Sequence, residues 1–157
     1  MQKLISVKEF SPLIQEFASY KSSIQGCSQK TVDEYLLDLR TFFRFLIARD
    51  LDITPETAEF YAIDVSAVGL ERLRSVTQDD VYQFLFYAGT VRGNRWSARA
   101  RKLASIRSLY KYLVSKRHYL TENPTVDVDS PKAQKSLPKV LSLDEAKRLL
   151  EAARTDY

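Results

Sequence analysis

The sequence holds very little of the chemistry that metal sites and nucleophilic catalysis need. It has one cysteine, Cys27, and one histidine, His118, among 157 residues. A single cysteine cannot form an internal disulfide, which fits a reducing compartment. One residue of each type also leaves no Cys/His cluster for zinc and no Cys–His nucleophile pair. We therefore expect no metal and no cofactor.

Long apolar runs are missing as well. None approaches the ~20 residues that cross a bilayer, and Lys3, Lys8 and Glu9 interrupt the N-terminus where a signal peptide would be apolar. Hydrophobic residues at 45% and charged residues at 28% are ordinary values for a folded globular protein. We expect a soluble, cytoplasmic protein with no membrane partner.

Acidic residues are absent from one long stretch. The 41 residues from 81 to 121 contain no Asp or Glu but nine Lys or Arg, so this segment carries the whole positive balance of a chain whose net charge is +4. Clustered cations gain by displacing counterions from phosphates, which favours a nucleic-acid partner. The alternative is a solvated helix face.

Apolar residues recur at helical spacing in four stretches. With their caps and breakers they predict helices over about 11–26, 28–49, 77–89 and 97–117. The acidic stretch 50–76 keeps no period and predicts a long connection with a short helix near 68–74.

The chain changes character after the fourth predicted helix. Three of its five prolines fall within 121–141, which predicts an extended linker. Ser142 and Glu145 then form a capping-box pattern before an amphipathic stretch. We expect this stretch to begin a second domain, or to fold back onto the first domain or a neighbouring molecule.

The candidate DNA contacts are cations and hydroxyls on the second and fourth predicted helices. Around the start of the fourth helix, basic side chains and free backbone N–H groups suggest a phosphate seat. The candidates there are Arg95, Ser97, Arg99, Arg101 and Lys102, followed by Arg107. Arg107 lies beside the apolar stripe and has a structural role as its equal alternative.

The second predicted helix supplies four more candidates, which are Lys30, Thr31, Arg40 and Arg44. The first two lie in the first turn, where a hydroxyl and backbone N–H groups can hold a phosphate; a supplementary cap is the equal alternative for Thr31. The two arginines stand four residues apart and so lie side by side. Their alternatives are pairing with Asp38 or bridging to the acidic stretch.

Three segments together resemble a known family. Residues 28–46 resemble the second helix of the N-terminal core-binding domain of tyrosine recombinases, through Thr31, Tyr35, Leu39, Phe42 and Phe43. Residues 97–113 resemble the fourth helix of that domain. Asn123-Pro124 and the segments 130–132 and 137–142 are similar to the interdomain linker of the Xer branch and related integrases.

The resemblance implies an all-α chain in three parts. These are a compact four-helix, SAM-like DNA-binding domain (1–120), an interdomain linker (121–141) and the first helix of a truncated catalytic domain (142–157). It also implies that the second and fourth helices approach the major groove of duplex DNA. The family's catalytic tyrosine, arginines, lysine and His or Trp lie in the second domain and map to no residue here, so we expect this chain not to cleave DNA.

The partners implied are double-stranded DNA, the protein's own catalytic domain and other recombinase protomers in a tetramer. A competing hypothesis is a non-enzymatic protein-interaction module that docks through its final helix, 143–153. A weaker one is a helix-turn-helix regulator, which the 93–97 connection and the proline-containing linker fit poorly.

Overall fold

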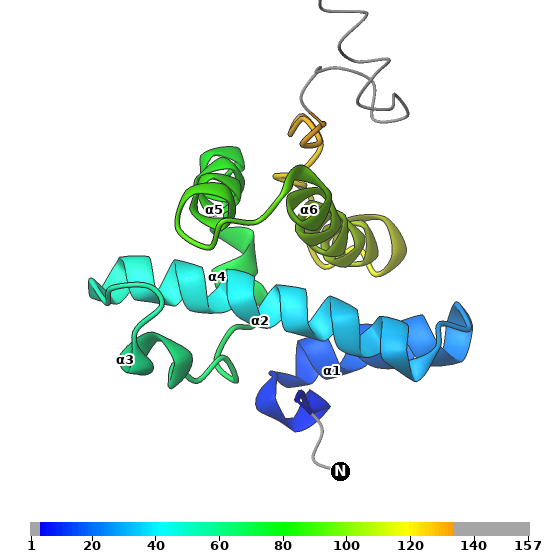
Figure 1. Cartoon of the computed structure of the whole chain (residues 1–157). Helices are drawn as coiled ribbons and strands as arrows, with labels where there is room; N and C mark the ends of the chain where they lie inside the picture. The colour runs from blue at the N-terminus through cyan, green and yellow to red at the C-terminus, as the bar shows by residue number, and fades with distance from the viewer. Residues whose placement is uncertain (1–3, 134–157) are drawn as a thin grey trace, which may run out of the picture.

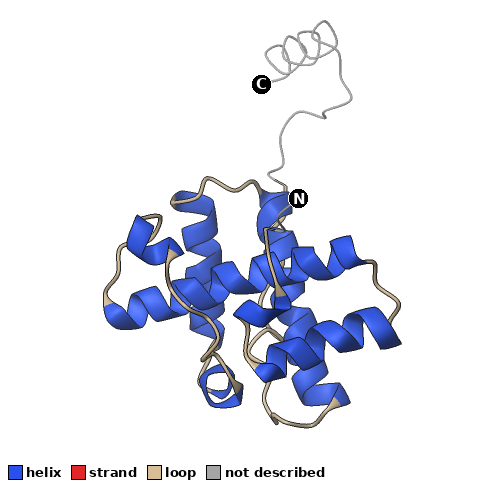
Figure 2. Ribbon diagram, turned by 90° about the horizontal axis from the view of Figure 1, so that it is seen from below, coloured by secondary structure: helices blue, strands red, loops and turns tan. Residues whose placement is uncertain are grey.

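The computed structural model describes residues 4–133, and the regular structure within that range is entirely helical (Figures 1 and 2). The elements in chain order are η1 (Val7–Glu9), α1 (Pro12–Ser19), η2 (Tyr20–Ile24), α2 (Gln29–Leu51), α3 (Ala58–Tyr61), α4 (Leu70–Arg74), α5 (Gln78–Thr90), α6 (Trp96–Lys111) and η3 (Tyr112–Lys116). The all-α prediction is confirmed. The second half of the expected linker and the whole of the expected final helix lie outside the described residues.

Local sequence signals set the helix starts. The Ser28 hydroxyl accepts a hydrogen bond from the Thr31 amide and caps α2. Thr77 and Asp80 form the expected capping box at the start of α5. Both α1 and α6 continue into a five-residue π-helical turn, η2 and η3 respectively.

Helix α2 is the centre of the fold. Figure 1 shows it crossing the molecule, with α5 and α6 on one side and α1 and α3 on the other. Leu39, Phe42 and Phe43 are fully buried within it. The Phe42 ring meets Phe84 of α5 edge-on, with ring centroids 5.0 Å apart. Because apolar residues occur on more than one face of α2, both layers of helices pack against it.

The acidic stretch 50–76 is more ordered than the sequence predicts. The short helix expected near 68–74 is present as α4, and α3 is an additional helix. Phe60, Val65, Val68 and Leu73 are all buried in the common core. The prediction of a long connection with one short helix is therefore confirmed for most of this stretch, and it is wrong only in omitting α3 and the buried side chains. Each short helix buries a single side chain, Phe60 in α3 and Leu73 in α4, which is too few to produce a visible period.

The beginning of the expected linker packs against the helices. Val128 is buried, and the Asp129 amide donates to the Tyr82 hydroxyl on α5 at 3.2 Å. Arg107 of α6 donates to the Ser130 hydroxyl at 2.7 Å and also to the Val128 carbonyl. The beginning of the expected linker therefore lies against α5 and α6 and is not extended away from the helices.

Candidate nucleic-acid interface

The outward face of α6 combines small and basic side chains. Arg101, Ala104, Ser108 and Lys111 follow one another at spacings of three and four residues, which places them on one face of the helix. All except the half-buried Ser108 are exposed. Two small residues in the middle of this face leave the helix surface open to close approach, with one cation toward each end.

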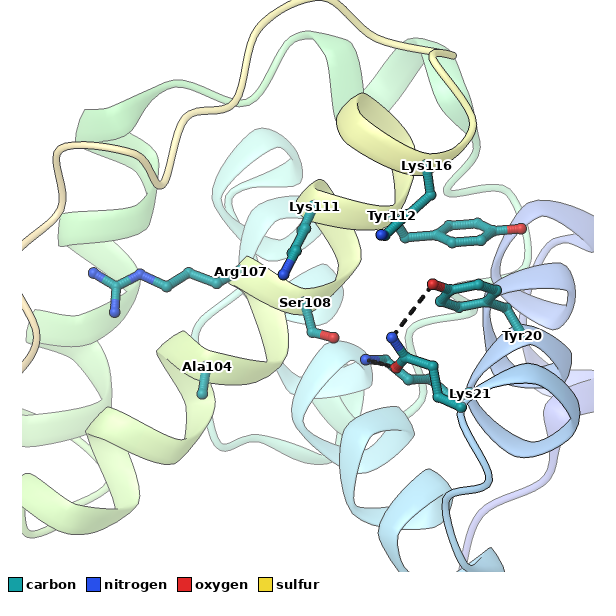
Figure 3. A pocket seen from close by; sticks show the side chains of 9 residues that line it. Tyr20, Lys21, Ala104, Arg107, Ser108, Lys111, Tyr112 and Lys116 are labelled. Atoms are coloured by element: carbon teal, nitrogen blue, oxygen red, sulfur yellow. Dashed lines mark hydrogen bonds between the residues drawn. The ribbon is translucent and has the colours of Figure 1, made fainter.

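A pocket of about 260 Å³ lies between α6, η3 and η2 (Figure 3). Four cations line it, which are Lys21, Arg107, Lys111 and Lys116, together with Tyr20, Gln25, Ala104, Ser108 and Tyr112. We call it the cation pocket. None of these lining residues is acidic. Figure 3 shows Arg107 extending away from Tyr20 and Lys21, so that its guanidinium lies apart from Lys111 and Lys116.

Lys21 is held in the wall of the cation pocket with little exposure. Its side chain lies against the rings of Phe17 and Tyr35, and its Nζ donates to Gln25 Oε1 at 2.7 Å. Burial lowers the pKa of Lys21, and the nearby charge of Lys111 lowers it further, against an opposite effect of Cys27. Cations brought close together without a carboxylate favour binding of an anion.

A second cleft, of about 160 Å³, lies between α6 and the first half of α2. Its lining residues are Thr31, Glu34, Tyr35, Asp38, Arg101, Ala104 and Ser105. We call it the α2–α6 cleft. Ala104 lines both this cleft and the cation pocket, so the two are neighbours along α6, and we call them together the α6 groove.

A buried carboxylate fixes Arg101 in the α2–α6 cleft. Asp38 is only 3% exposed, and it accepts hydrogen bonds from Arg101 Nε at 3.2 Å and Nη2 at 3.0 Å. The Ser105 hydroxyl donates to the same carboxylate at 2.7 Å. The Arg101 side chain nevertheless stays 55% exposed, so it is both anchored and accessible.

Three of the predicted contact residues line the α6 groove, namely Thr31, Arg101 and Arg107. The Thr31 hydroxyl also accepts from Ser28 at 3.0 Å, so it takes part in the cap of α2. The Arg107 guanidinium is tied to the segment after η3, which gives it a structural role. Three further candidates, Lys30, Arg95 and Ser97, are exposed around the starts of α2 and α6.

Two candidates on α6 are not on its exposed face, contrary to the prediction. Lys102 is 5% exposed, and burial lowers its pKa, opposed by Asp38 and reinforced by Arg101. Arg99 lies across α5 where Gly89 leaves room for it, and its buried Nε has no hydrogen-bond partner among the described residues. The directions of both side chains are set by how the neighbouring helices pack against α6, which the sequence does not reveal.

The two arginines in the middle of α2 lie away from the α6 groove. Arg40 pairs with Glu9 at 2.7 Å, and Arg44 Nε donates to the Ile63 carbonyl at 3.3 Å. The alternative that an arginine bridges to the acidic stretch is thus confirmed for Arg44. The alternative partner Asp38 is wrong, because that carboxylate bonds to Arg101 and Ser105 of α6.

Sequence reasoning missed Lys21, Lys111 and Lys116 as members of the site. Lys111 belongs to the acid-free segment and shares a helix face with Arg101, which was a usable signal. Lys21 had no such signal, because only the fold brings η2 beside α6. Within residues 4–133, no group of three His, Cys, Asp or Glu could hold a metal, and no helix is long and apolar enough to span a membrane.

The chain is similar to curated tyrosine recombinases along most of its length. It is 38% identical over 144 residues to tyrosine recombinase XerC of Caldanaerobacter subterraneus subsp. tengcongensis, covering 92% of this chain. It is 34% identical over 143 residues to XerC of Myxococcus xanthus and 32% identical over 145 residues to XerD of Shewanella oneidensis. The chain spans only about 40% of the length of these relatives. No family model and no solved structure matches it.

Proposed function

Because this chain is a homologue of the Xer tyrosine recombinases, we propose that it binds duplex DNA as the N-terminal part of a site-specific recombinase. The observation that carries the proposal is the cation pocket, whose lining includes three lysines, Lys21, Lys111 and Lys116, and no acidic residue. Phosphates are the natural counter-charge for such a pocket, since neutralising them releases condensed counterions.

The length and the exposed face of α6 suit the major groove of a duplex. A helix of the length of α6 spans about 24 Å, and the major groove of B-DNA, about 12 Å wide, admits one α-helix. The exposed face of α6 carries Ala104 and Ser108 at its middle, so base edges can approach it closely. The pocket cations beside that face would then meet the backbone phosphates that border the groove.

The parent protein would cut and rejoin DNA through a catalytic domain outside this chain. The residues of the α6 groove would bind and orient the duplex and would take no part in the chemistry. The functional unit would combine this part with its own catalytic domain and with further recombinase protomers on DNA, as a tetramer. A location in the cytoplasm, where the DNA of a bacterium lies, follows from this function.

Fluorescence anisotropy with a labelled duplex of about 30 base pairs, at several salt concentrations, tests the proposal. If five to seven cations contact phosphates, log K should fall against log salt with a slope of roughly −4 to −6. Lys111→Ala should make this slope shallower by about 0.9, the value for one lost phosphate contact. Lys21→Met should have the same effect.

Lys8→Ala is the matched control, because Lys8 is an exposed lysine on η1, outside the residues that line the α6 groove. It should leave both the affinity and the slope unchanged. Weak binding that does not respond to salt would refute the proposal. Equal effects of Lys8→Ala and Lys111→Ala would refute the α6 groove as the binding surface.

A further inference from the structure

The Asp38–Arg101 pair divides the donors of one guanidinium into two sets. Asp38 uses Nε–H and one N–H of Nη2, which form the side edge of the group. Three of the five N–H groups of an arginine then remain, two on Nη1 and one on Nη2. They form the end of the guanidinium, and more than half of the Arg101 side chain is open to solvent.

The charges around Arg101 disfavour a phosphate as its outer partner. The α2–α6 cleft contains two carboxylates, Asp38 and Glu34, against a single cation. A phosphate placed there would face both carboxylates, whereas the cation pocket offers it three lysines and no acidic residue. An acceptor without a full negative charge suits the remaining donors of Arg101 better.

The two parts of the α6 groove are also well separated along the helix. Arg101 and Lys111 are ten residues apart on the same face of α6, a rise of about 15 Å. Ala104 lies between them and is exposed. A duplex held by its phosphates at the cation pocket would therefore present the interior of a groove, rather than its backbone, to the other end of α6.

We propose that Arg101 reads a guanine through its O6 and N7 atoms, and that Asp38 is the positioning residue that makes this reading selective. This inference rests on the proposed DNA-binding function and assigns sequence specificity to one pair of residues. Both guanine atoms are uncharged acceptors that match two parallel N–H groups of arginine. Lys21 and Lys111, in contrast, hold phosphates and carry no sequence information.

Asp38 contributes by limiting the freedom of Arg101. A free arginine side chain samples many rotamers and adapts to phosphates as readily as to bases. Bonding to a carboxylate that is itself held by Ser105 fixes the plane of the guanidinium before DNA arrives. The N–H groups of Arg101 then cannot rearrange to suit a wrong base pair. A bidentate arginine–guanine pair of this kind favours guanine over other bases by roughly ten- to hundredfold in affinity.

Selection from a pool of duplexes with a randomised central segment tests the inference, because the target site is unknown. The wild-type chain should enrich sequences with at least one strongly preferred G·C pair. The main variant is the double substitution Asp38→Asn with Arg101→Gln. It removes both charges together and leaves no buried charge without a partner, so thermal melting should show a folded protein.

The double variant should lose the preference at one G·C pair by roughly ten- to hundredfold, while its salt slope stays that of the wild type. Asp38→Asn alone should weaken the preference at the same pair. Asp38→Asn should also tighten binding to unrelated duplexes, because it removes one negative charge from the face. Lys111→Ala is the matched control and should change the slope by about 0.9 but not the selected sequence.

The outcomes separate this inference from the proposed function. A wild-type chain that binds no duplex overturns both. A chain that binds with a steep salt slope but selects no sequence overturns the inference alone. So does a double variant that keeps the full preference, or one whose slope falls by about 0.9, since that is the behaviour of a phosphate contact. An unchanged preference in Asp38→Asn overturns the positioning role of Asp38.

Discussion

Replacing Lys102 by methionine should stabilise the protein without weakening DNA binding. Lys102 is only 5% exposed, although it lies in the basic segment. Methionine keeps a flexible, unbranched chain of similar length in the same space. The substitution therefore removes a buried charge while it preserves the packing around α6.

The expected gain is about 1 kcal/mol. The apolar stem of the side chain is buried in both proteins, so the area removed from water hardly changes. What changes is the ammonium, which loses part of its hydration in the fold; even an uncharged polar group costs on the order of 1–3 kcal/mol to bury. Attraction to Asp38 offsets part of this cost, but that carboxylate already has Arg101 and Ser105 as partners. A gain of this size corresponds to a rise in Tm of roughly 4 °C.

The pH dependence gives the same prediction a second readout. Burial lowers the pKa of Lys102 below its ordinary 10.5, so the unfolded state binds the proton more tightly than the folded state. The stability of the wild type should consequently rise with pH between the lowered folded-state pKa and 10.5. Lys102→Met lacks this contribution, so its advantage should be full below that window and shrink as the pH rises through it.

Urea unfolding at neutral and alkaline pH measures the free energy, and anisotropy with a duplex measures the salt slope. A loss of stability at neutral pH would refute the reasoning about burial. A slope that becomes shallower by about 0.9 would show that Lys102 contacts a phosphate after all. The partial exposure of Arg101 next to it makes Arg101 the contrasting case, since its charge remains at the surface.

Three further predictions concern single contacts. Tyr110→Phe removes a buried hydrogen bond from α6 to a carbonyl of α4 and should cost about 1 kcal/mol in urea unfolding. Burial raises the pKa of Glu56, but hydrogen bonds from two tyrosines including Tyr87 and the ion pair with an arginine bring it below 4.5 overall. Acid titration of stability should thus show a loss as the pH falls below 4.5, and Glu56→Gln should flatten that part of the curve. Gly89→Ala should raise Tm, with a gain of up to about 1 kcal/mol in helix propensity, because the added Cβ meets Cδ and Nη1 of Arg99 at 3.3 Å and a small shift of this long side chain relieves the contact.

The sequence was sufficient where the physical signal is local. The periodic stripes and caps of α1, α2, α5 and α6 predicted four long helices, because each amphipathic helix carries its own pattern of buried positions. It was insufficient between α2 and α5, where Phe60 and Val65 enter a core formed by helices elsewhere in the chain. Short elements of this kind depend on tertiary packing, so no pattern among neighbouring residues predicts them.

The same division applies to the candidate site. Segregation of charge along the chain indicates a phosphate-binding protein from the sequence alone, since the net charge of a segment depends only on its residue types. Which cations remain available could not be predicted in this way. Packing turns Lys102 and Arg99 toward the interior and α5, and it brings Lys21 beside Lys111 from a distant part of the chain.

The sequence by itself determined the helical class, the positions of the main caps and the basic character of one segment, because these follow from residue type and spacing. Only the tertiary structure decided that Asp38 binds Arg101, that Ala104 lines two neighbouring depressions, and that Lys21 lies beside two other lysines in a pocket without a carboxylate. The reason is that a side chain's partners depend on how helices cross, and crossing is set by the packing of the whole core.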